Sequence, residues 1–439
     1  MMHRRVVITG MGIVTPLGHR LDGFWDNLTA GRSGVGPIST FDASEYPVRI
    51  AAEVPKSWSM ESVGENSRQW ATAPRQTRFA LAAGIMAVRD SGIDLERFDP
   101  RLSGVYLGCG EPFTPFSPLV DSISQSLNDH SFQPAAYTDT ALRLFDPESQ
   151  RQFDPKMPAI ALAGRFNLQG PSVNCIAACV SSSQAIGQAV RMIRRGEVNT
   201  MLCGGAHSCI HELGVTGFSR LSALSQQNAN PKQAARPFDR SRDGFVIGEG
   251  GALFVAEEFE QARRRGAPIY AEISGYGSAQ DAFRITDTHP EGRGCVQAIR
   301  RALKDAGIDG EDLDYINAHG TGTVLNDKVE TRSIKSALGS VAYDIPVSST
   351  KSMLGHATTA CGAIELAVSL MAMQTNTLPP TINYDDPDPE CDLDYIPNVA
   401  RDAKCRHILS NNIGFGGQNA ALILSRVSEP RSYWQSAAA

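Results

Sequence analysis

The sequence predicts an α/β protein built from two similar halves. Three kinds of string occur twice along the chain and in the same order. The first is a β-branched run that ends in Gly-x-Gly, at residues 5–12 and again at 269–277. Because the repeated strings alternate between strand-like and helix-like patterns, we expect a mostly parallel sheet in each half, covered by helices.

The other two repeats support the same duplication. AVRDSGIDLERF (87–98) and ALKDAGIDGEDL (302–313) share six of twelve positions, and a strand-like string follows each. AIGQAV (185–190) and AIELAV (363–368) have the apolar spacing of helices. Short strings of Ala, Gly and Asp also recur by chance, but three matches in one order favour duplication. We place the first half at 1–265, the second at 266–426 and a poorly ordered tail at 427–439.

Composition limits the classes of function. The 439 residues, 42% of them hydrophobic, can fill sizeable cores, and a net charge of −6 argues against a nucleic-acid partner. No run approaches the ~18 apolar residues of a membrane span, and a strand-like run near the N-terminus leaves no room for a secretory signal. The nine cysteines are scattered without a CxxC pair, which fits a reducing compartment. We therefore expect a cytoplasmic protein without a membrane partner.

The region 111–158 differs from the rest of the first half. It is rich in proline and aromatic residues and has weak periodicity. We interpret it as an insertion that covers or lines a pocket.

The most informative residue is Cys179, in the string NCIAACVSSSQAIGQAVRMIRRG (174–196). Small residues lead directly into a helix-like pattern there. A thiol at a helix N-terminus meets unpaired N–H groups and the positive end of the helix dipole, which favours the thiolate. The same amides could hold an oxyanion. A buried packing role is the plain alternative for one isolated cysteine.

Two histidines strengthen the interpretation of Cys179 as a nucleophile. His319 ends a strand-like run in NAHGTGT (317–323), and His356 lies in STKSMLGHATTACG (349–362), five positions after Lys351. In open α/β sheets, ligands gather where strands end and helices begin, so we expect these groups to meet there. The same three side chains could bind zinc, although their spacing is not that of a metal loop and no fourth ligand stands out.

Two glycine-rich strings could bind a ligand through their backbone. GMGIVTPLG (10–18) follows a strand but lacks the GxGxxG spacing, so it is a weak signal for nicotinamide binding. In NNIGFGGQN (411–419), the flanking glycines could free the Phe415 amide to face a substrate oxygen while the ring moves as a gate. A plain turn is the alternative.

Together the strings resemble the β-ketoacyl-[acyl-carrier-protein] synthases of the thiolase superfamily, most closely the second elongating type. The resemblance spans nearly the whole chain and includes VVITGMGIVTPLG, GPSVNCIAAC, ARPFDRSRDGFVIGEGGALFVAEE, NAHGTGTVLNDKVE, VSSTKSMLGH and GFGGQN. It implies a thiolase-like duplicated fold with five αβαβα layers, and a homodimer.

Carried over residue by residue, the resemblance also implies roles. Cys179 matches the acyl-accepting nucleophile, His319 and His356 the histidine pair, Lys351 the catalytic lysine and Phe415 the gate. The remaining matches are hydroxyls that hold the pantetheine arm, Thr321 and Thr323, and acidic residues of a supporting polar network, Asp327 and Glu330.

The implied reaction is a decarboxylative Claisen condensation. The thiolate takes the acyl group, malonyl-acyl-carrier protein loses CO₂, and the resulting enolate attacks the acyl-enzyme to give 3-oxoacyl-acyl-carrier protein. No metal or other cofactor is needed. Two rival functions are a cysteine-dependent acyltransferase or thioester hydrolase, and a non-catalytic subunit that binds carrier protein.

Several departures from the family pattern concern the substrate. Glu111 stands where an apolar pocket residue is usual, so it could reshape the acyl pocket as a substrate-binding residue, or turn outward. Val180 and Gln418 also differ from the common residues. We hypothesise a specialised synthase of secondary metabolism as the alternative to fatty acid elongation.

An acidic carrier protein would need basic docking residues. Two arginine-rich stretches could supply them, and they contain Arg68, Arg75 and Arg78, and Arg263, Arg264 and Arg265.

Overall fold

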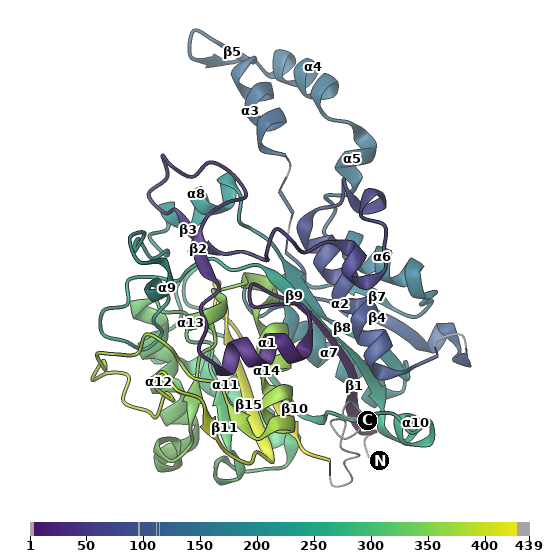
Figure 1. Ribbon diagram of the computed structural model, residues 1–439, viewed down its shortest axis with the longest axis vertical. Coiled ribbons are helices and arrows are strands. Elements are labelled where there is room, and N and C mark those ends of the chain that lie inside the picture. The colour runs from purple at the N-terminus through teal and green to yellow at the C-terminus, as the bar shows by residue number, and fades with distance from the viewer. Residues whose placement is uncertain (1–3, 95–96, 111, 114, 428–439) are drawn as a thin grey trace.

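The computed structural model describes residues 4–94, 97–110, 112–113 and 115–427. Within these ranges a sheet of ten strands crosses the molecule in the order β12-β11-β15-β16-β10-β1-β9-β8-β4-β7 (Figure 1). One end of the sheet consists of β1 (Val6–Val14), β4 (Ser103–Leu107), β7 (Ser172–Asn174), β8 (Thr200–His207) and β9 (Gly250–Glu258). The other consists of β10 (Ala271–Gln280), β11 (Tyr315–Asn317), β12 (Val347–Ser348), β15 (His407–Ile413) and β16 (Gln418–Ser425).

These two sets of five strands have the same order and directions. In chain order, the first strand of each set pairs with the fifth, the fifth with the fourth, the fourth with the second, and the second with the third. The first two ladders are antiparallel and the last two parallel in both sets. The predicted duplication is confirmed. Four strands of each set run in one direction and only β9 or β16 runs against them, so the expectation of a mostly parallel sheet in each half is confirmed.

The two sets join at their first strands. β1 pairs with β10 in an antiparallel ladder, with Val7 opposite Glu272 and Ile8 opposite Ala271. The Tyr270 amide adds a hydrogen bond to the Ile8 carbonyl at 2.9 Å. The ladder is short, but it makes the two sets one continuous sheet.

The repeated Gly-x-Gly strings have a packing cause. An added Cβ would lie 2.1 Å from a helix carbonyl oxygen at Gly12 and 1.9 Å from one at Gly277. Both oxygens belong to the helix that packs on that strand, α2 (Arg75–Ser91) or α11 (Arg293–Ala306). Only glycine permits so close an approach of helix to strand. Gly10 and Gly12 are therefore explained by helix packing without a dinucleotide.

The helices form three layers around the sheet. α2 and α6 (Met157–Phe166) cover the first set of strands, and α11 and α12 (Val324–Leu338) cover the second. Between the sets lie α7 (Ser181–Arg195) and α14 (Cys361–Thr375), each of which packs against strands of both sets. Almost every residue of α14 is buried, as expected for a helix with neighbours on all sides. This arrangement is the predicted five-layered αβαβα fold.

Smaller elements complete the body. No helix of the described ranges is long and apolar enough to cross a membrane. The remaining helices are α1 (Leu21–Thr29), α8 (Glu212–Arg220), α9 (Pro231–Ala234), α10 (Phe259–Arg264) and α13 (Lys351–Leu354), with 3₁₀ turns at Met60–Val63, Ser67–Trp70, Pro100–Leu102, Gly310–Asp312, Gly339–Tyr343 and Thr358–Ala360. Two-stranded pairs are formed by β2 (Val35–Pro37) with β3 (Ile50–Ala52), and by β13 (Thr377–Leu378) with β14 (Arg401–Asp402).

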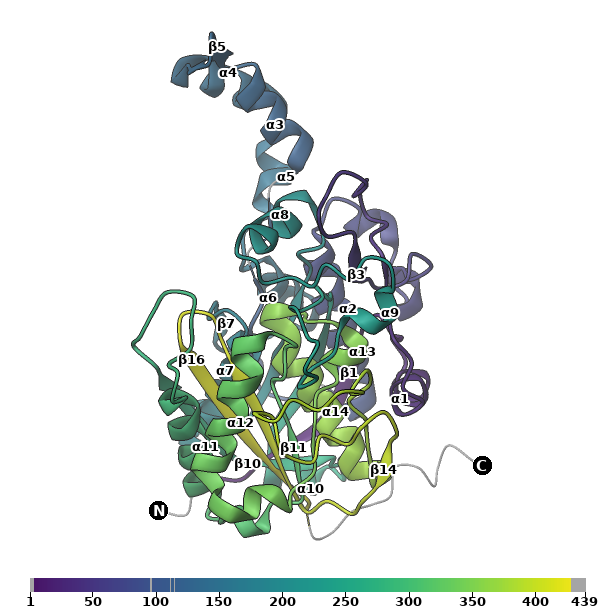
Figure 2. The ribbon, with the colours of Figure 1, turned by 90° about the vertical axis from the view of Figure 1, so that its left-hand side faces the viewer.

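The region predicted as an insertion is an arm that projects from the body (Figures 1 and 2). It contains α3 (Phe116–Ser124), the hairpin β5 (Leu127–Asn128) and β6 (Ser131–Phe132), α4 (Pro134–Leu144) and α5 (Pro147–Arg151). None of its described residues lines the cavity that contains Cys179, so the expectation that it lines that pocket is wrong for the described residues. Its apolar side chains are turned outward instead. Leu142 is 77% exposed.

The predicted tail needs one correction. Val427 is only 8% exposed and packs against Val7 and Ala262, so it belongs to the body. Residues 428–439 lie outside the described ranges. The predicted boundary between residues 265 and 266 lies between α10 and β10, and the division there remains a prediction.

Candidate active site

Cys179 lies in a tight turn immediately before α7. Ala178 has a positive φ of 48°, and α7 begins at Ser181, two residues after the thiol. The Ser181 hydroxyl accepts a hydrogen bond from the Ala177 amide at 2.8 Å and donates one to the Ala178 carbonyl at 2.7 Å. These bonds hold the strained turn, which presents the thiol at the floor of a cavity while leaving it 8% exposed.

His356 faces this thiol. Its Nε2 atom lies 3.1 Å from the Cys179 Sγ atom. The His356 amide donates to the Val246 carbonyl at 2.7 Å, and the Gly248 amide donates to the His356 carbonyl at 3.0 Å, so the backbone is fixed on both sides. Burial, together with the nearby Lys351 charge, keeps the pKa of His356 well below its usual value. The ring is therefore neutral, and its Nδ1 atom has no hydrogen-bond partner among the residues that the structure describes.

His319 follows β11 and completes the cluster. Its ring centroid lies 5.2 Å from that of His356, and the rings are nearly perpendicular. The Nδ1 atom of His319 lies 3.3 Å from Lys351 Nζ and 3.4 Å from Asn412 Nδ2. Both neighbours are hydrogen-bond donors, so Nδ1 must accept and the proton must reside on Nε2. Burial and the Lys351 charge also lower the pKa of His319 well below its usual value.

Lys351 is held by Glu365, a residue that the sequence interpretation missed. The two form an ion pair inside the protein, and Lys351 Nζ also donates to the His319 carbonyl at 2.5 Å. Burial alone would lower the pKa of Lys351, but the Glu365 charge outweighs it and the pKa is raised. The lysine therefore stays charged beside His319. A lone carboxylate in the otherwise apolar string AIELAV was the available signal for Glu365.

Asn412 is a second residue that was missed. Its Nδ2 atom donates to Glu365 Oε2 at 2.6 Å, and its Oδ1 atom accepts from the Ser183 hydroxyl at 2.5 Å. It thereby connects the Lys351–Glu365 pair with α7, the helix that follows the nucleophile. No spacing rule in the sequence indicates such a contact.

Glu330 and Asp327 lie on α12 and hold the loop after His319. Glu330 accepts from the amides of His319 and Gly320, each at 2.7 Å. Burial raises the pKa of Glu330 to about 7, against the effect of these amides. Asp327 accepts from the Gly322 amide at 3.2 Å and lies 3.5 Å from the Arg242 guanidinium. Both carboxylates fix backbone and do not line the cavity.

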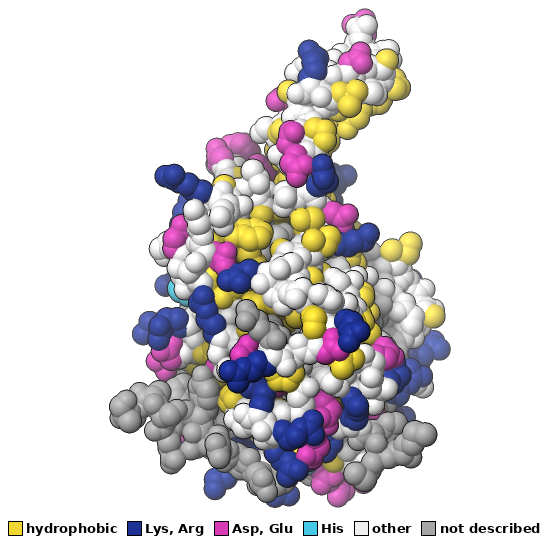
Figure 3. Space-filling model, turned by 90° about the vertical axis from the view of Figure 1, so that its right-hand side faces the viewer, with side chains coloured by type: hydrophobic (Ala, Val, Ile, Leu, Met, Phe, Trp, Pro, Cys, Tyr) yellow, Lys and Arg dark blue, Asp and Glu magenta, His cyan; other side chains and the backbone are white. Residues whose placement is uncertain are grey.

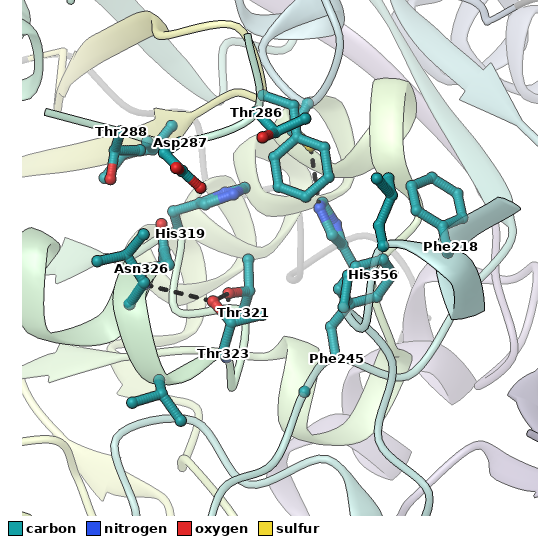
Figure 4. A pocket seen from close by; sticks show the side chains of 18 of the residues that line it. Phe218, Phe245, Thr286, Asp287, Thr288, His319, Thr321, Thr323, Asn326 and His356 are labelled. Carbon is teal, nitrogen blue, oxygen red and sulfur yellow. Dashed lines mark hydrogen bonds between the residues drawn. The ribbon is translucent and has the colours of Figure 1, made fainter. Parts of the chain in front are cut away.

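Thr321 and Thr323 do line the cavity, between its mouth and the histidines (Figure 4). Their hydroxyls lie 2.9 Å apart, and Thr323 also accepts from the Asn326 amide at the start of α12. This places two hydroxyls where a polar arm entering the cavity could meet them.

Phe415 lies in the turn between β15 and β16, and it lines the same cavity. Gly416 and Gly417, the next two residues, have φ angles of 86° and 80°, which only glycine adopts easily. The Phe415 amide is directed at the Cys179 sulfur, where it lowers the pKa of the thiol. Two amides, those of Phe415 and Cys179, are thus available beside the sulfur.

The expected thiolate character of Cys179 needs a correction. Burial raises the pKa of this thiol to about 11, and the Phe415 amide and the Lys351 charge offset only part of that rise. The resting side chain is therefore a neutral thiol. Loss of water around the sulfur raises this pKa more than the adjacent amides and the Lys351 charge lower it.

The cavity measures about 310 Å³ and runs from the histidines to the surface. Thr286, Asp287 and Thr288 lie on one side and Phe218 and Phe245 on the other (Figure 4). Glu111, expected at the acyl pocket, lies outside the described residues.

The same three side chains also meet the geometric condition for a metal site. One ligand atom each from Cys179, His319 and His356 lies within 4.8 Å of the other two. No fourth histidine, cysteine or carboxylate joins them among the described residues. Activity in the presence of a chelator therefore separates the zinc interpretation from the catalytic one.

The arginines expected to dock a carrier protein are mostly engaged elsewhere. Arg75 is paired with the buried Glu249, and Arg265 with the buried Glu257. Arg263 is paired with Glu260 at 2.7 Å on α10, at the lower edge of the molecule in Figure 1. Burial lowers the pKa of Arg78. Of the residues named, Arg68 and Arg264 are exposed and have no ion pair among the described residues.

Comparisons with known proteins agree with this geometry. Residues 3–262 match the family model of the beta-ketoacyl synthase N-terminal domain, and residues 270–385 match that of the C-terminal domain. The chain is 41% identical over 436 residues to the tetracenomycin polyketide synthase ketoacyl synthase alpha subunit of Streptomyces glaucescens, covering 98% of this chain and 99% of the relative. It is 40% identical over 436 residues to 3-oxoacyl-[acyl-carrier-protein] synthase 2 of Coxiella burnetii, covering 97% and 100%.

Solved structures give the same picture. A beta-ketoacyl synthase from Burkholderia phymatum is 34% identical and superposes with a TM-score of 0.84, over 97% of this chain and 100% of the other. A type II polyketide ketosynthase, solved with its acyl-carrier protein, is 32% identical with a TM-score of 0.85 over the same shares.

Proposed function

The chain belongs to the beta-ketoacyl synthase family, and we propose that Cys179, His319 and His356 perform its decarboxylative condensation. The enzyme is an acyltransferase that joins an acyl group to malonyl-acyl-carrier protein and forms 3-oxoacyl-acyl-carrier protein and CO₂. The observation that carries the proposed roles is the convergence of one thiol and two neutral imidazoles, from distant parts of the chain, at the floor of one cavity.

The first step transfers the acyl group to Cys179. The sulfur attacks the thioester carbonyl, and His356 Nε2, 3.1 Å away, accepts the thiol proton. Proton acceptance by His356 is needed because the resting thiol is neutral. The amides of Cys179 and Phe415 stabilise the tetrahedral oxyanion, an effect worth about 3–4 kcal/mol for one well-placed donor. The carrier thiolate leaves and takes the proton.

The second step cleaves the carboxyl–carbon bond of the malonyl group. CO₂ leaves and its bonding electron pair forms an enolate, whose oxygen needs hydrogen-bond donors. His319 supplies Nε2–H, because Lys351 and Asn412 occupy its Nδ1 atom. His356 can supply the second donor, since its unpartnered Nδ1 leaves the ring free to carry its proton on Nε2 in this step.

The third step forms the carbon–carbon bond. The enolate carbon attacks the acyl-enzyme carbonyl, the same two amides hold the oxyanion, and Cys179 leaves as a thiolate that takes up a proton from water, the one proton that the whole reaction consumes. Thr321 and Thr323 would hold the pantetheine arm, and Lys351, Glu330 and Asp327 would position His319 and its loop. Phe415 would gate the passage to the sulfur.

Mass spectrometry tests these roles. The intact protein is incubated with a panel of acyl-carrier proteins and then with malonyl-acyl-carrier protein. We expect an acyl adduct on Cys179 that disappears as 3-oxoacyl product forms, with EDTA having no effect. An adduct that is only hydrolysed would indicate a hydrolase. Absence of any adduct would indicate a non-catalytic carrier-binding subunit.

The same panel tests the substrate. We propose a specialised synthase, supported by the high identity to polyketide ketosynthases and by the unusual Val180 and Gln418. Identity to fatty acid synthases is equally high, so chain length decides. Robust extension of medium and long saturated acyl chains would overturn this part of the proposal.

The arm supports a homodimer. Its exposed apolar side chains gather along one projection of the molecule (Figure 3), and a second copy could cover them.

The cytoplasmic location is also part of the proposal. It is supported by the nine cysteines, which are all free thiols, as is usual in a reducing compartment.

A further inference from the structure

The mouth of the cavity is surrounded by exposed apolar side chains. Leu221, Val324 and Leu325 line the cavity and are about half exposed. The loop between β10 and α11 adds Phe283 and Ile285, directly before the cavity-lining Thr286. Ile285 is 88% exposed. We call these five residues the mouth rim.

Such a group is unusual on a solvent-facing surface. Single exposed apolar residues are common, but several around one opening mark an interaction site. The mouth rim does not belong to the arm, because its residues come from α8, the β10–α11 loop and the start of α12. The two apolar surfaces therefore need different partners.

Most basic residues of the segments beside the cavity are paired with carboxylates of the chain. Arg284 is paired with Asp287 at 3.1 Å, Arg240 lies 3.8 Å from Asp386, and Lys328 is paired with Glu390. On the next turns of α12, Lys335 is paired with Asp392, whereas Arg332 donates to the Pro290 carbonyl and keeps its charge. Arg220, beside Leu221, has no ion pair among the described residues. An electrostatic docking surface would need more free charge than this.

We propose that the acyl-carrier protein docks on the mouth rim chiefly through apolar contacts, with Arg220 as an accessory charge. This inference rests on the proposed function. A carrier-bound thioester must reach Cys179 through the mouth, and its arm is covalently attached, so the carrier body must sit on the mouth rim. The earlier expectation of arginine-based docking is replaced by an apolar contact.

Substitutions at Ile285 test the nature of the contact, because this side chain is exposed and does not line the cavity. We compare Ile285→Asp with Ile285→Lys, using acyl- and malonyl-carrier proteins and, separately, carrier-free N-acetylcysteamine thioesters. Loss of an apolar contact predicts that both variants raise the KM for carrier substrates about tenfold. Carrier-free kinetics should stay unchanged. The matched control is Val399→Asp, because Val399 is 74% exposed and lies outside the mouth rim. This substitution should change neither the KM for carrier substrates nor the carrier-free kinetics.

Opposite responses of the two variants would overturn the proposal. If Ile285→Asp raises the KM while Ile285→Lys lowers it, docking is electrostatic, and an unchanged KM in both would place docking elsewhere. A salt series gives a second measure, since an apolar contact predicts a KM that changes less than about threefold across physiological ionic strengths. If the wild type condenses neither carrier-bound nor carrier-free thioesters, the proposed function itself fails.

Discussion

The Nε2 atom of His356 lies 3.1 Å from the Sγ atom of Cys179, although 177 positions separate the two residues. The thiol precedes α7, which packs between the two sets of strands, and the histidine follows α13.

Replacing Cys179 by alanine should remove the acyl adduct and reduce condensation by about a thousandfold or more. Cys361 provides a matched control, because its sulfur lies only 3.2 Å from the Cys179 carbonyl oxygen but has no access to the cavity. Cys361→Ala should retain the adduct. Intact mass after incubation with acyl-carrier protein measures both, and an adduct on Cys179→Ala would disprove the assignment of the nucleophile.

The two histidines should fail at different steps. His356→Ala should slow acylation of Cys179, since it removes the proton acceptor. His319→Ala should leave acylation intact but slow malonyl decarboxylation by about 10²–10⁴-fold. Single-turnover acylation and CO₂ release separate the steps. Equal effects of both substitutions on acylation would contradict this division.

Alkylation of Cys179 should become faster with pH without levelling off near neutrality. Burial raises the pKa of the thiol to about 11. Below that pH, each rise of one pH unit therefore increases the fraction of reactive thiolate about tenfold. Inactivation by iodoacetamide between pH 7 and 9 measures the slope, with Cys179→Ala as the blank. A plateau near pH 7 would show that the helix N-terminus and Lys351 outweigh burial.

His207 should make the protein sensitive to acid. Burial lowers its pKa to about 4, whereas the unfolded chain binds a proton near pH 6.5. Protonation therefore favours the unfolded state as pH falls below 6.5, and the free energy of unfolding drops by about 2 kcal/mol between pH 7 and 5.

His207→Asn, which can keep a donor to Gln76, should lose this part of the pH dependence in urea titrations. The substitution His130→Asn, in the exposed arm, is the control and should behave as the wild type. If the free energy of unfolding falls equally between pH 7 and 5 in His207→Asn and in the wild type, His207 is not the source of the acid sensitivity.

Leu142→Glu should weaken self-association, because it places a charge on the exposed apolar surface of the arm. Sedimentation should shift from dimer to monomer, while Val399→Glu, on the body, should remain dimeric. A wild type that is monomeric alone and associates only with a homologous subunit would replace the homodimer by a heterodimer.

Much of the fold was predictable from local patterns. The Gly-x-Gly strings at Gly10 and Gly275 recur because each half packs a helix against its first strand at the same close distance. Such a constraint acts through neighbouring atoms and leaves a trace in short strings. Strand direction leaves no such trace, so nothing in the sequence indicated that β9 and β16 run against the other strands of their sets.

The site was predictable to the same extent. Cys179, His319 and His356 each lie in a distinctive string, but Asn412 and Glu365 act through contacts between distant segments. The charge state of Cys179 depends on how completely water is excluded, which is a property of the closed cavity and not of the string. The orientation of the arm likewise could not be predicted, because it depends on the partner that covers its apolar side chains.

The ladder between β1 and β10 has a mechanical consequence. Each strand of this pair is the innermost member of its own set, so the half that carries the sulfur and the half that carries the imidazoles share one continuous sheet. A hinge motion between the two halves would break the hydrogen bonds between β1 and β10. Substrates must therefore come and go by small movements of surface loops, while the spacing of the reacting atoms stays constant through the cycle.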